Sequence, residues 1–289
     1  MENKQLKWVF ITVLALVWGS SFILIKKGLM ALSGFQVGSL RIIFAASFLL
    51  IIGFRSVLTI SKTQWKFIVL TSFFGTFIPA FLFAIAQQHI SSAVSAVLNS
   101  LTPINTLILG ALAFGIGIKK NQIIGVFIGL VGSLILILSG AAEHPEQNYW
   151  YSSLVVLATI CYATNVNILK KYLSDLSPIA ISTGNFVVIV VPAFVVLFYT
   201  GFFNNQHYDI AVQKAIFFIG ILGVVGTGMA NIIFFKLIQI SSPVFATSVT
   251  YLIPIVAFFW GLLDNETLSV LQIFGAVVIL AGIWMASKK

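Results

Sequence analysis

The chain has 289 residues, of which 60% are hydrophobic and 8% are charged, and it carries a formal net charge of +9. Because about a quarter of the residues of a soluble domain are charged, this composition and a mean hydropathy of +1.09 exclude a water-soluble domain and predict a polytopic membrane protein. The Lys and Arg residues are scattered in short loops, so the positive charge does not indicate a nucleic-acid partner. The single cysteine, Cys161, excludes an intrachain disulfide and a cysteine metal cluster.

Ten apolar stretches have the length that a membrane-spanning helix needs, which is about 20 residues. They cover residues 7–27, 35–54, 67–87, 93–116, 121–139, 150–169, 178–200, 214–237, 243–262 and 269–286. The first also resembles a signal peptide, because Lys4 and Lys7 precede it, but its apolar run is long and lacks a clear cleavage site. The expected fold is therefore an all-α integral membrane protein with ten transmembrane helices.

The distribution of positive charges predicts how these helices are oriented in the membrane. If the N-terminus is cytoplasmic, the inner side receives twelve Lys and Arg residues and the outer side receives three. The inner set is Lys4, Lys7, Arg55, Lys62, Lys66, Lys119, Lys120, Lys170, Lys171, Lys236, Lys288 and Lys289, and the outer set is Lys26, Lys27 and Lys214. Cytoplasmic loops carry the excess of Lys and Arg, so both termini are expected to face the cytoplasm.

The second half of the chain repeats parts of the first half. The matched segments are residues 17–29 with 161–173, at an offset of 144, and residues 90–94 with 240–244, at an offset of 150. The first match places Trp18 on Tyr162 and Lys26 on Lys170. Similar segments in the same order indicate an internal duplication.

The duplication divides the chain into one repeat at residues 1–144 and another at residues 145–289. Each repeat has five expected spans, an odd number, so the second repeat enters the membrane from the opposite side. Inverted repeats recur in secondary transporters, because two similar halves can expose a site at the middle of the membrane to either side in turn.

Pro103 and Pro254 lie near the middle of the fourth and ninth expected spans. A proline inside a helix removes one backbone hydrogen bond, and the freed carbonyl needs a partner in protein or in cavity water. Interrupted helices at corresponding positions of two halves point to a transporter's binding site. Both prolines are therefore candidate gating or kink positions, and a simple packing kink is the alternative.

Arg41 is the cationic candidate at membrane depth, about six residues inside the second span and roughly 9 Å below its outer boundary at 1.5 Å per residue. Its guanidinium needs backbone carbonyls, water or a substrate anion, or else it extends to the lipid headgroups. Lys26, at the end of the first span, is a second candidate for the same vestibule.

Uncharged polar and aromatic residues within several spans are further candidates for contact with a ligand. They are Trp18, Ser21, Asn99, Asn165, Asn231 and Tyr251. Polar side chains at this depth also hold helices together, and aromatic side chains also serve in packing, so these roles remain as alternatives.

Groups that would indicate an enzyme, a metal site or an ATP-driven pump are not grouped in the sequence. His89, His144 and His207 are far apart and lack metal-ligand spacing, and no phosphate-binding loop occurs. We therefore expect no catalytic residue, no metal and no cofactor. No Asp or Glu lies deep in an expected span, which disfavours a carboxylate relay and favours uniport or exchange.

Several of these residues together resemble one known family. Residues 18–22 read WGSSF and are followed by Lys26, Arg41, Pro103, Pro254, Asn265 to Leu268, Gly275 and Gly282. Over nearly its whole length the chain resembles the EamA-type transporters of the drug/metabolite transporter superfamily. It departs from them where a glycine–glutamate pair is common before the last helix of each half, because residues 117–120 read GIKK and Asp264 and Asn265 precede Glu266.

The resemblance implies a ten-helix inverted-repeat fold whose central cavity is formed chiefly by spans one to four and six to nine. It also implies that the protein moves small metabolites, often amino acids or related compounds, across a bacterial cytoplasmic membrane. We expect an alternating-access transporter of zwitterionic or anionic metabolites, as a monomer or homodimer surrounded by lipid. A lipid flippase or carrier and a passive channel in the same membrane are the alternatives.

Overall fold

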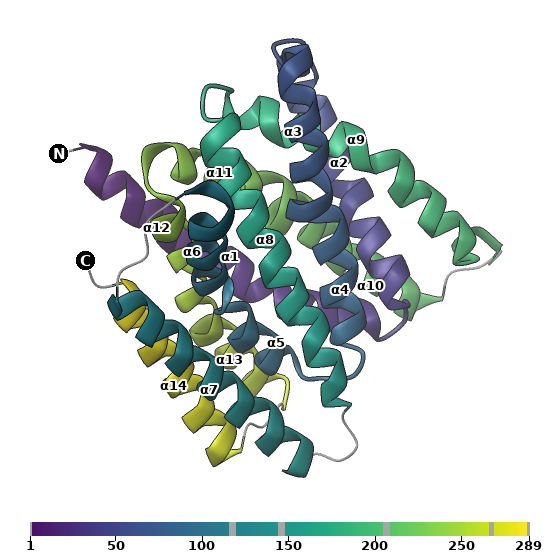
Figure 1. Cartoon of the computed structure of the whole chain (residues 1–289). Helices are drawn as coiled ribbons and strands as arrows, with labels where there is room; N and C mark the ends of the chain where they lie inside the picture. Colours follow the sequence, from purple (N-terminus) through teal and green to yellow (C-terminus); the bar gives the residue numbers. More distant parts are fainter. Residues whose placement is uncertain (1, 116–119, 144–147, 205–208, 266–268, 288–289) are drawn as a thin grey trace.

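The computed structural model describes residues 2–115, 120–143, 148–204, 209–265 and 269–287. Within these ranges the chain folds into helices and contains no strand (Figure 1), which confirms the predicted all-α class. The helices are α1 (Glu2–Leu29), α2 (Gly34–Val57), α3 (Lys62–Ser72), η1 (Phe73–Phe77), α4 (Ile78–Ala86), α5 (Ser92–Asn99), α6 (Thr102–Phe114), α7 (Lys120–Glu143), η2 (Tyr149–Tyr151), α8 (Ser152–Tyr172), α9 (Pro178–Tyr199), η3 (Phe202–Asn204), α10 (Ile210–Gly223), η4 (Val224–Met229), α11 (Ala230–Ile240), α12 (Pro243–Thr247), η5 (Ser248–Tyr251), α13 (Ile253–Leu263) and α14 (Val270–Ser287).

Eight helical stretches among the described residues are long and apolar enough to cross a membrane. They are Gln5–Leu29, Gly34–Val57, Lys62–Ala86, Ser92–Phe114, Tyr149–Tyr172, Pro178–Tyr199, Ile210–Ile240 and Pro243–Leu263. Two shorter apolar helices, Ile123–Ser139 and Val270–Gly282, coincide with the fifth and tenth expected spans. The boundary expected between residues 144 and 145 and the family-like residues 117–119 and 266–268 lie outside the described ranges.

Matched serines begin the second helix of each expected half. The hydroxyl of Ser33 accepts a hydrogen bond from the Gln36 backbone N–H at 3.3 Å, ahead of α2, and Ser177 accepts one from Ala180 at 3.2 Å, ahead of α9. A serine in this position satisfies one of the free N–H groups of the first helical turn. Similar local sequences, 144 residues apart, thus start equivalent helices.

The first helix of each expected half packs mainly against the other half. Helix α1 contacts α10, α11 and α13, whereas α8 contacts α3, α4, α5 and α6. Helices α2 and α9 pack along each other at one side of these contacts (Figure 1). The two halves are therefore interlocked, and the centre of the molecule is bordered by both.

Four of the spans that border the centre are interrupted. Helix α6 begins at Thr102 with Pro103 in its first turn, and α13 begins at Ile253 with Pro254 in its first turn, so each span breaks just before its proline. The third and eighth spans instead contain the π-helical turns η1 and η4, which the hydrophobic pattern did not predict. Such turns often occur at functional sites.

Helices α7 and α14 lie side by side at one edge of the molecule, drawn in teal and yellow in Figure 1, and pack closely on each other. Glycines make this approach possible. A Cβ atom on Gly282 would lie 2.5 Å from the backbone nitrogen of Gly129 and 2.6 Å from the carbonyl oxygen of Gly125. Small residues at a membrane helix interface let two backbones approach in this way.

Replacing Gly282 by Ala is expected to lower the melting temperature of the detergent-solubilised protein, because the new methyl group meets backbone atoms that cannot turn aside. Overpacking of this kind costs about 1–3 kcal/mol. Gly220→Ala is the matched control, since a Cβ there would lie 4.0 Å from its nearest neighbour outside the adjoining helix backbone, on Phe44. A melting temperature for Gly282→Ala equal to that of the control would contradict the close packing of α7 and α14.

Candidate functional site

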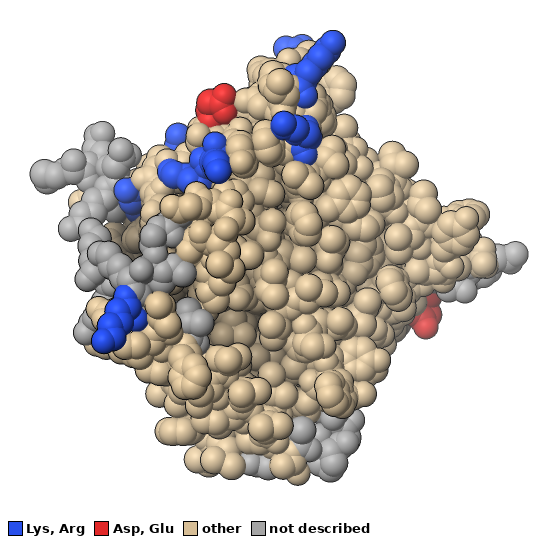
Figure 2. Space-filling view, viewed as in Figure 1, with Lys and Arg blue, Asp and Glu red and all other residues tan. Residues whose placement is uncertain are grey.

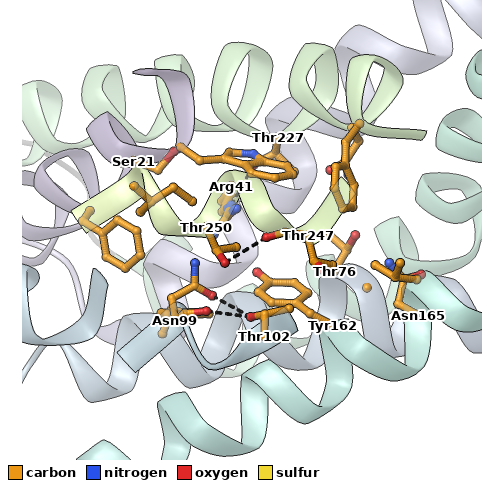
Figure 3. Close-up of a pocket in the computed structure, with 18 of the residues that line it drawn as sticks. Ser21, Arg41, Thr76, Asn99, Thr102, Tyr162, Asn165, Thr227, Thr247 and Thr250 are labelled. Atoms are coloured by element: carbon orange, nitrogen blue, oxygen red, sulfur yellow. Dashed lines mark hydrogen bonds between the residues drawn. The ribbon is translucent and has the colours of Figure 1, made fainter. Parts of the chain in front are cut away.

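A cavity of about 90 Å³ lies at the centre of the molecule, between the two expected halves. This volume is several times the minimum of about 15 Å³ that one water molecule needs, so it suits a small ligand. The residues that line it are Trp18, Ser21, Phe22, Ile25, Arg41, Gly75, Thr76, Phe83, Asn99, Thr102, Tyr162, Asn165, Val166, Thr227, Asn231, Phe234, Phe235, Thr247, Thr250 and Ile253. Figure 3 shows its polar side chains converging from several helices.

Arg41 supplies the positive charge of this cavity. It projects from α2, and its Nε donates a hydrogen bond of 2.7 Å to the hydroxyl of Thr227 on η4. The phenol of Tyr162, on α8, is its other polar neighbour. Arg41 makes no ion pair with any residue that the structure describes, and the described lining contains no Asp or Glu. The ionisable groups of the described lining therefore carry a net positive charge, from Arg41.

Trp18 and Ser21, on successive turns of α1, border the cavity beside the π-helical turn η4. The indole nitrogen of Trp18 donates a 3.0 Å hydrogen bond to the carbonyl oxygen of Gly226. The Trp18 ring packs edge-on against the ring of Phe234, with 4.9 Å between the two ring centroids. The Ser21 hydroxyl donates to the carbonyl of Val17 at 3.0 Å. The Trp18 side chain thus connects α1 to η4 by a hydrogen bond.

Amides and threonines form the other side of the cavity. The hydroxyl of Thr102 donates to the backbone and side-chain oxygens of Asn99, at 2.7 and 3.3 Å, and Thr250 donates to the carbonyl of Thr247 at 2.9 Å (Figure 3). Asn165 is 3% exposed, and its Oδ1 accepts no hydrogen bond from any described residue. A buried acceptor without a partner is costly.

Six of the eight predicted contact residues line the cavity: Trp18, Ser21, Arg41, Asn99, Asn165 and Asn231. Tyr251 is not in the lining. It packs instead against a cluster of buried hydrophobic side chains that includes Phe22 and Ile253. Lys26 is also not in the lining, because its Nζ lies 2.6 Å from Oδ2 of Asp264, just beyond α13. Asp264 also pairs with Lys27.

Burial and the two lysines act in opposite directions on the pKa of the Asp264 carboxyl. Burial by itself raises the pKa of this group, but the hydrogen bonds and charges of Lys26 and Lys27 outweigh burial and hold the pKa below its usual value. Asp264 is therefore ionised at neutral pH. Its charge joins the end of α1 to the end of α13, outside the cavity.

Several lining residues were missing from the sequence-based candidates, and the repeat contained a signal for four of them. Tyr162 is the repeat equivalent of Trp18, at an offset of 144. Gly75 and Thr76 on η1 correspond to Gly226 and Thr227 on η4 at an offset of 151, and both threonines line the cavity. Thr102 and Thr250 are polar residues within apolar stretches, which was itself a signal, whereas Thr247 had no comparable signal. In the part of the chain that is described, no group of three acidic, His or Cys side chains is placed to hold a metal.

Comparison with a family model gives two consecutive matches that together cover most of the chain. The model of the EamA-like transporter family matches residues 6–138 and again residues 149–288. The chain belongs to the EamA-like transporter family. This membership and the apolar helices make it a multi-pass membrane protein.

Relatives of similar length carry transporter names. An uncharacterized transporter of Archaeoglobus fulgidus is 24% identical over 287 residues, which cover 98% of this chain and 99% of that protein. The uncharacterized inner membrane transporter YedA of Escherichia coli K12 is 26% identical, with 100% of this chain and 96% of YedA covered. The S-adenosylmethionine/S-adenosylhomocysteine transporter of Chlamydia muridarum is 23% identical, over 86% of this chain and 80% of its own. These names support a role other than catalysis.

A solved crystal structure has the same overall fold. It aligns with 96% of this chain and 95% of its own chain with a TM-score of 0.68, at 14% sequence identity. At that identity the likeness extends to the fold alone.

Proposed function

We propose that this EamA-family protein moves small anionic or zwitterionic metabolites, such as amino acids and related compounds, across the cell membrane by alternating access to the central cavity. The observation that carries the proposal is the guanidinium of Arg41, which borders a cavity without a carboxylate partner among the described residues. An unpaired charge at membrane depth is costly and by default functional. A substrate carboxylate supplies the missing partner.

The proposed architecture is ten transmembrane helices in two inverted repeats, at residues 1–144 and 145–289. The two separate family matches support this division, and so do the equivalent breaks at Pro103 and Pro254. Counting α7 and α14 as spans gives five in each half, and an odd number inverts the second half. Rocking of the halves about the breaks at Pro103 and Pro254 changes access to the cavity.

The proposed orientation places both termini in the cytoplasm of a bacterial cell. On the face shown in Figure 2, Lys and Arg side chains lie along one edge, and the middle of the face is uncharged. Described cations at the corresponding helix ends are Lys7, Arg55, Lys62, Lys66, Lys120, Lys170, Lys171 and Lys236. The excess at one end follows the positive-inside rule. The name of the Escherichia coli relative as an inner membrane transporter agrees with this location.

Two groups in the cavity suit the two ends of an amino acid. The guanidinium of Arg41 pairs with a carboxylate, and rotation of the Asn165 side chain lets its unpartnered Oδ1 accept a hydrogen bond from an ammonium group. The Chlamydia muridarum relative is named for S-adenosylmethionine and S-adenosylhomocysteine, and both compounds contain an α-amino acid group. We do not extend those two substrates to this chain, only their shared chemical group.

The test is a thermal-shift screen of the purified protein in detergent, with L-amino acids compared against the corresponding amino acid amides, organic acids, cationic drugs and phospholipids. A ligand that binds the folded state raises the melting temperature. We expect shifts from amino acids or organic acids and none from the amides, which lack the carboxylate. Counterflow of the radiolabelled ligand in liposomes then distinguishes a carrier from a channel. Shifts from lipids alone would contradict the proposal and favour a flippase.

A further inference from the structure

The hydroxyl of Thr227 connects Arg41 to the backbone of the eighth span. Arg41 Nε donates to this oxygen at 2.7 Å, and the hydroxyl lies 3.0 Å from the carbonyl oxygen of Leu222. A guanidinium has donors and no acceptor, so the threonine oxygen must accept from Arg41. Its single proton is then left for the Leu222 carbonyl, and the direction of both hydrogen bonds is determined.

The π-helical turn makes this connection possible. Thr227 lies within η4, and the carbonyl that it reaches belongs to the residue five positions earlier. That spacing matches the i to i+5 pairing of a π-helix rather than the i to i+4 pairing of an α-helix. The hydroxyl is therefore held on both sides and faces Arg41 as a fixed acceptor.

The equivalent threonine of the first half has no such role. Thr76 occupies the same Gly-Thr pair within η1 and also lines the cavity. The residue that corresponds to Arg41 at an offset of 144 is Asn185, whose Oδ1 accepts from the hydroxyl of Thr71 at 2.9 Å. The two halves share the threonine, but only the first half has an arginine at the equivalent position. Substitution of Thr76 is therefore the matched control for substitution of Thr227.

We propose that Thr227 is the positioning residue for Arg41: by holding Nε, it turns both terminal nitrogens of the guanidinium toward the ligand, where they bind one carboxylate side by side. Paired N–H donors match the geometry of a carboxylate better than a freely rotating cation does. Holding the guanidinium in this orientation before the ligand binds lowers the conformational entropy that is lost on association. This inference rests on the proposed function, because it assigns Arg41 to substrate binding.

The orientation of Arg41 can be measured without any ligand. The chain contains two arginines, Arg41 and Arg55, so protein labelled with ¹⁵N-arginine gives two Nε–H signals, and the exposed Arg55 at the end of α2 is an internal reference. We expect the Arg41 signal to exchange slowly with water, and Thr227→Val to accelerate that exchange at least about tenfold. Thr76→Val should leave the Arg41 signal unchanged. An Arg41 signal in Thr227→Val like that of the wild type overturns the inference.

The consequence for binding is tested with an equimolar mixture of L-amino acids as the probe, by thermal shift in detergent. Loss of one hydrogen bond to a charged group corresponds to about a tenfold loss of affinity, which we expect for Thr227→Val. Thr227→Ser, which keeps the hydroxyl, should restore affinity to within about twofold. Thr164→Val, whose hydroxyl bonds within its own helix at Ile160, controls for loss of a threonine outside the cavity.

The outcomes separate this inference from the proposed function. If Arg41→Gln abolishes the response to the amino acid mixture and Thr227→Val binds like the wild type, the positioning role is wrong and the proposed function stands. If Arg41→Gln binds like the wild type, the proposed carboxylate site itself is wrong, and the exchange rate of the Arg41 signal in Thr227→Val still decides whether Thr227 holds the guanidinium.

Discussion

Arg41→Gln is expected to lower the affinity for an amino acid about 10–100-fold and to reduce counterflow in liposomes accordingly. Hydrogen bonds that involve a charged group contribute about 1.5–3 kcal/mol, and every 1.4 kcal/mol is about tenfold in affinity. Glutamine keeps a donor for Thr227 but has neither the positive charge nor the paired terminal nitrogens. The loss therefore reports on the carboxylate contact.

Stability should change little, or rise, in the same variant. Arg41 has no ion-pair partner among the described residues, and a buried charge that lacks a partner is unfavourable. We expect a melting temperature of the ligand-free protein at or above that of the wild type. Lys214→Gln removes an exposed cation outside the cavity and serves as the control for charge alone. Wild-type affinity in folded Arg41→Gln would show that the cavity does not recognise a carboxylate through this residue.

Gly75→Val is expected to reduce transport about 10–200-fold while the protein still folds. Gly75 lies in η1 at the cavity, and a Cβ there would lie 2.6–2.7 Å from the side-chain amide atoms of Asn165. A valine must push that amide aside and fill part of a cavity of about 90 Å³. A single methylene in a closely fitting site changes binding by about 1–3 kcal/mol, or 10–200-fold.

The neighbour of Gly75 is the end of a side chain rather than backbone, so the strain can be relieved by rotating Asn165. We therefore expect a small change in melting temperature, in contrast to Gly282→Ala. Gly220→Val is the matched control, because Gly220 is a glycine of α10 that is absent from the cavity lining and has space around it. Saturable transport at the wild-type rate by Gly75→Val would mean that ligands do not pass through this cavity.

Local properties of the chain were sufficient for the class of protein and for most helix positions. Eight of the ten apolar stretches coincide with helices that are long and apolar enough to cross a membrane. Pro103 and Pro254 predicted where two spans break, because the missing N–H is a property of the residue itself. The depth of Arg41 within its span was also sufficient to select it, and the structure places it at the cavity.

Only the tertiary structure decided which polar side chains meet. Lys26 was a second cationic candidate for the same vestibule, but Asp264, far away in the sequence, lies beside it and pairs with it. Tyr251 is one residue from Thr250, yet Thr250 lines the cavity and Tyr251 does not. Tyr162 and Thr227 come to Arg41 from α8 and η4 because each half packs against the helices of the other. Hydrophobicity and periodicity describe one helix at a time. Which polar side chains meet at the cavity depends on how the helices of both halves pack around it.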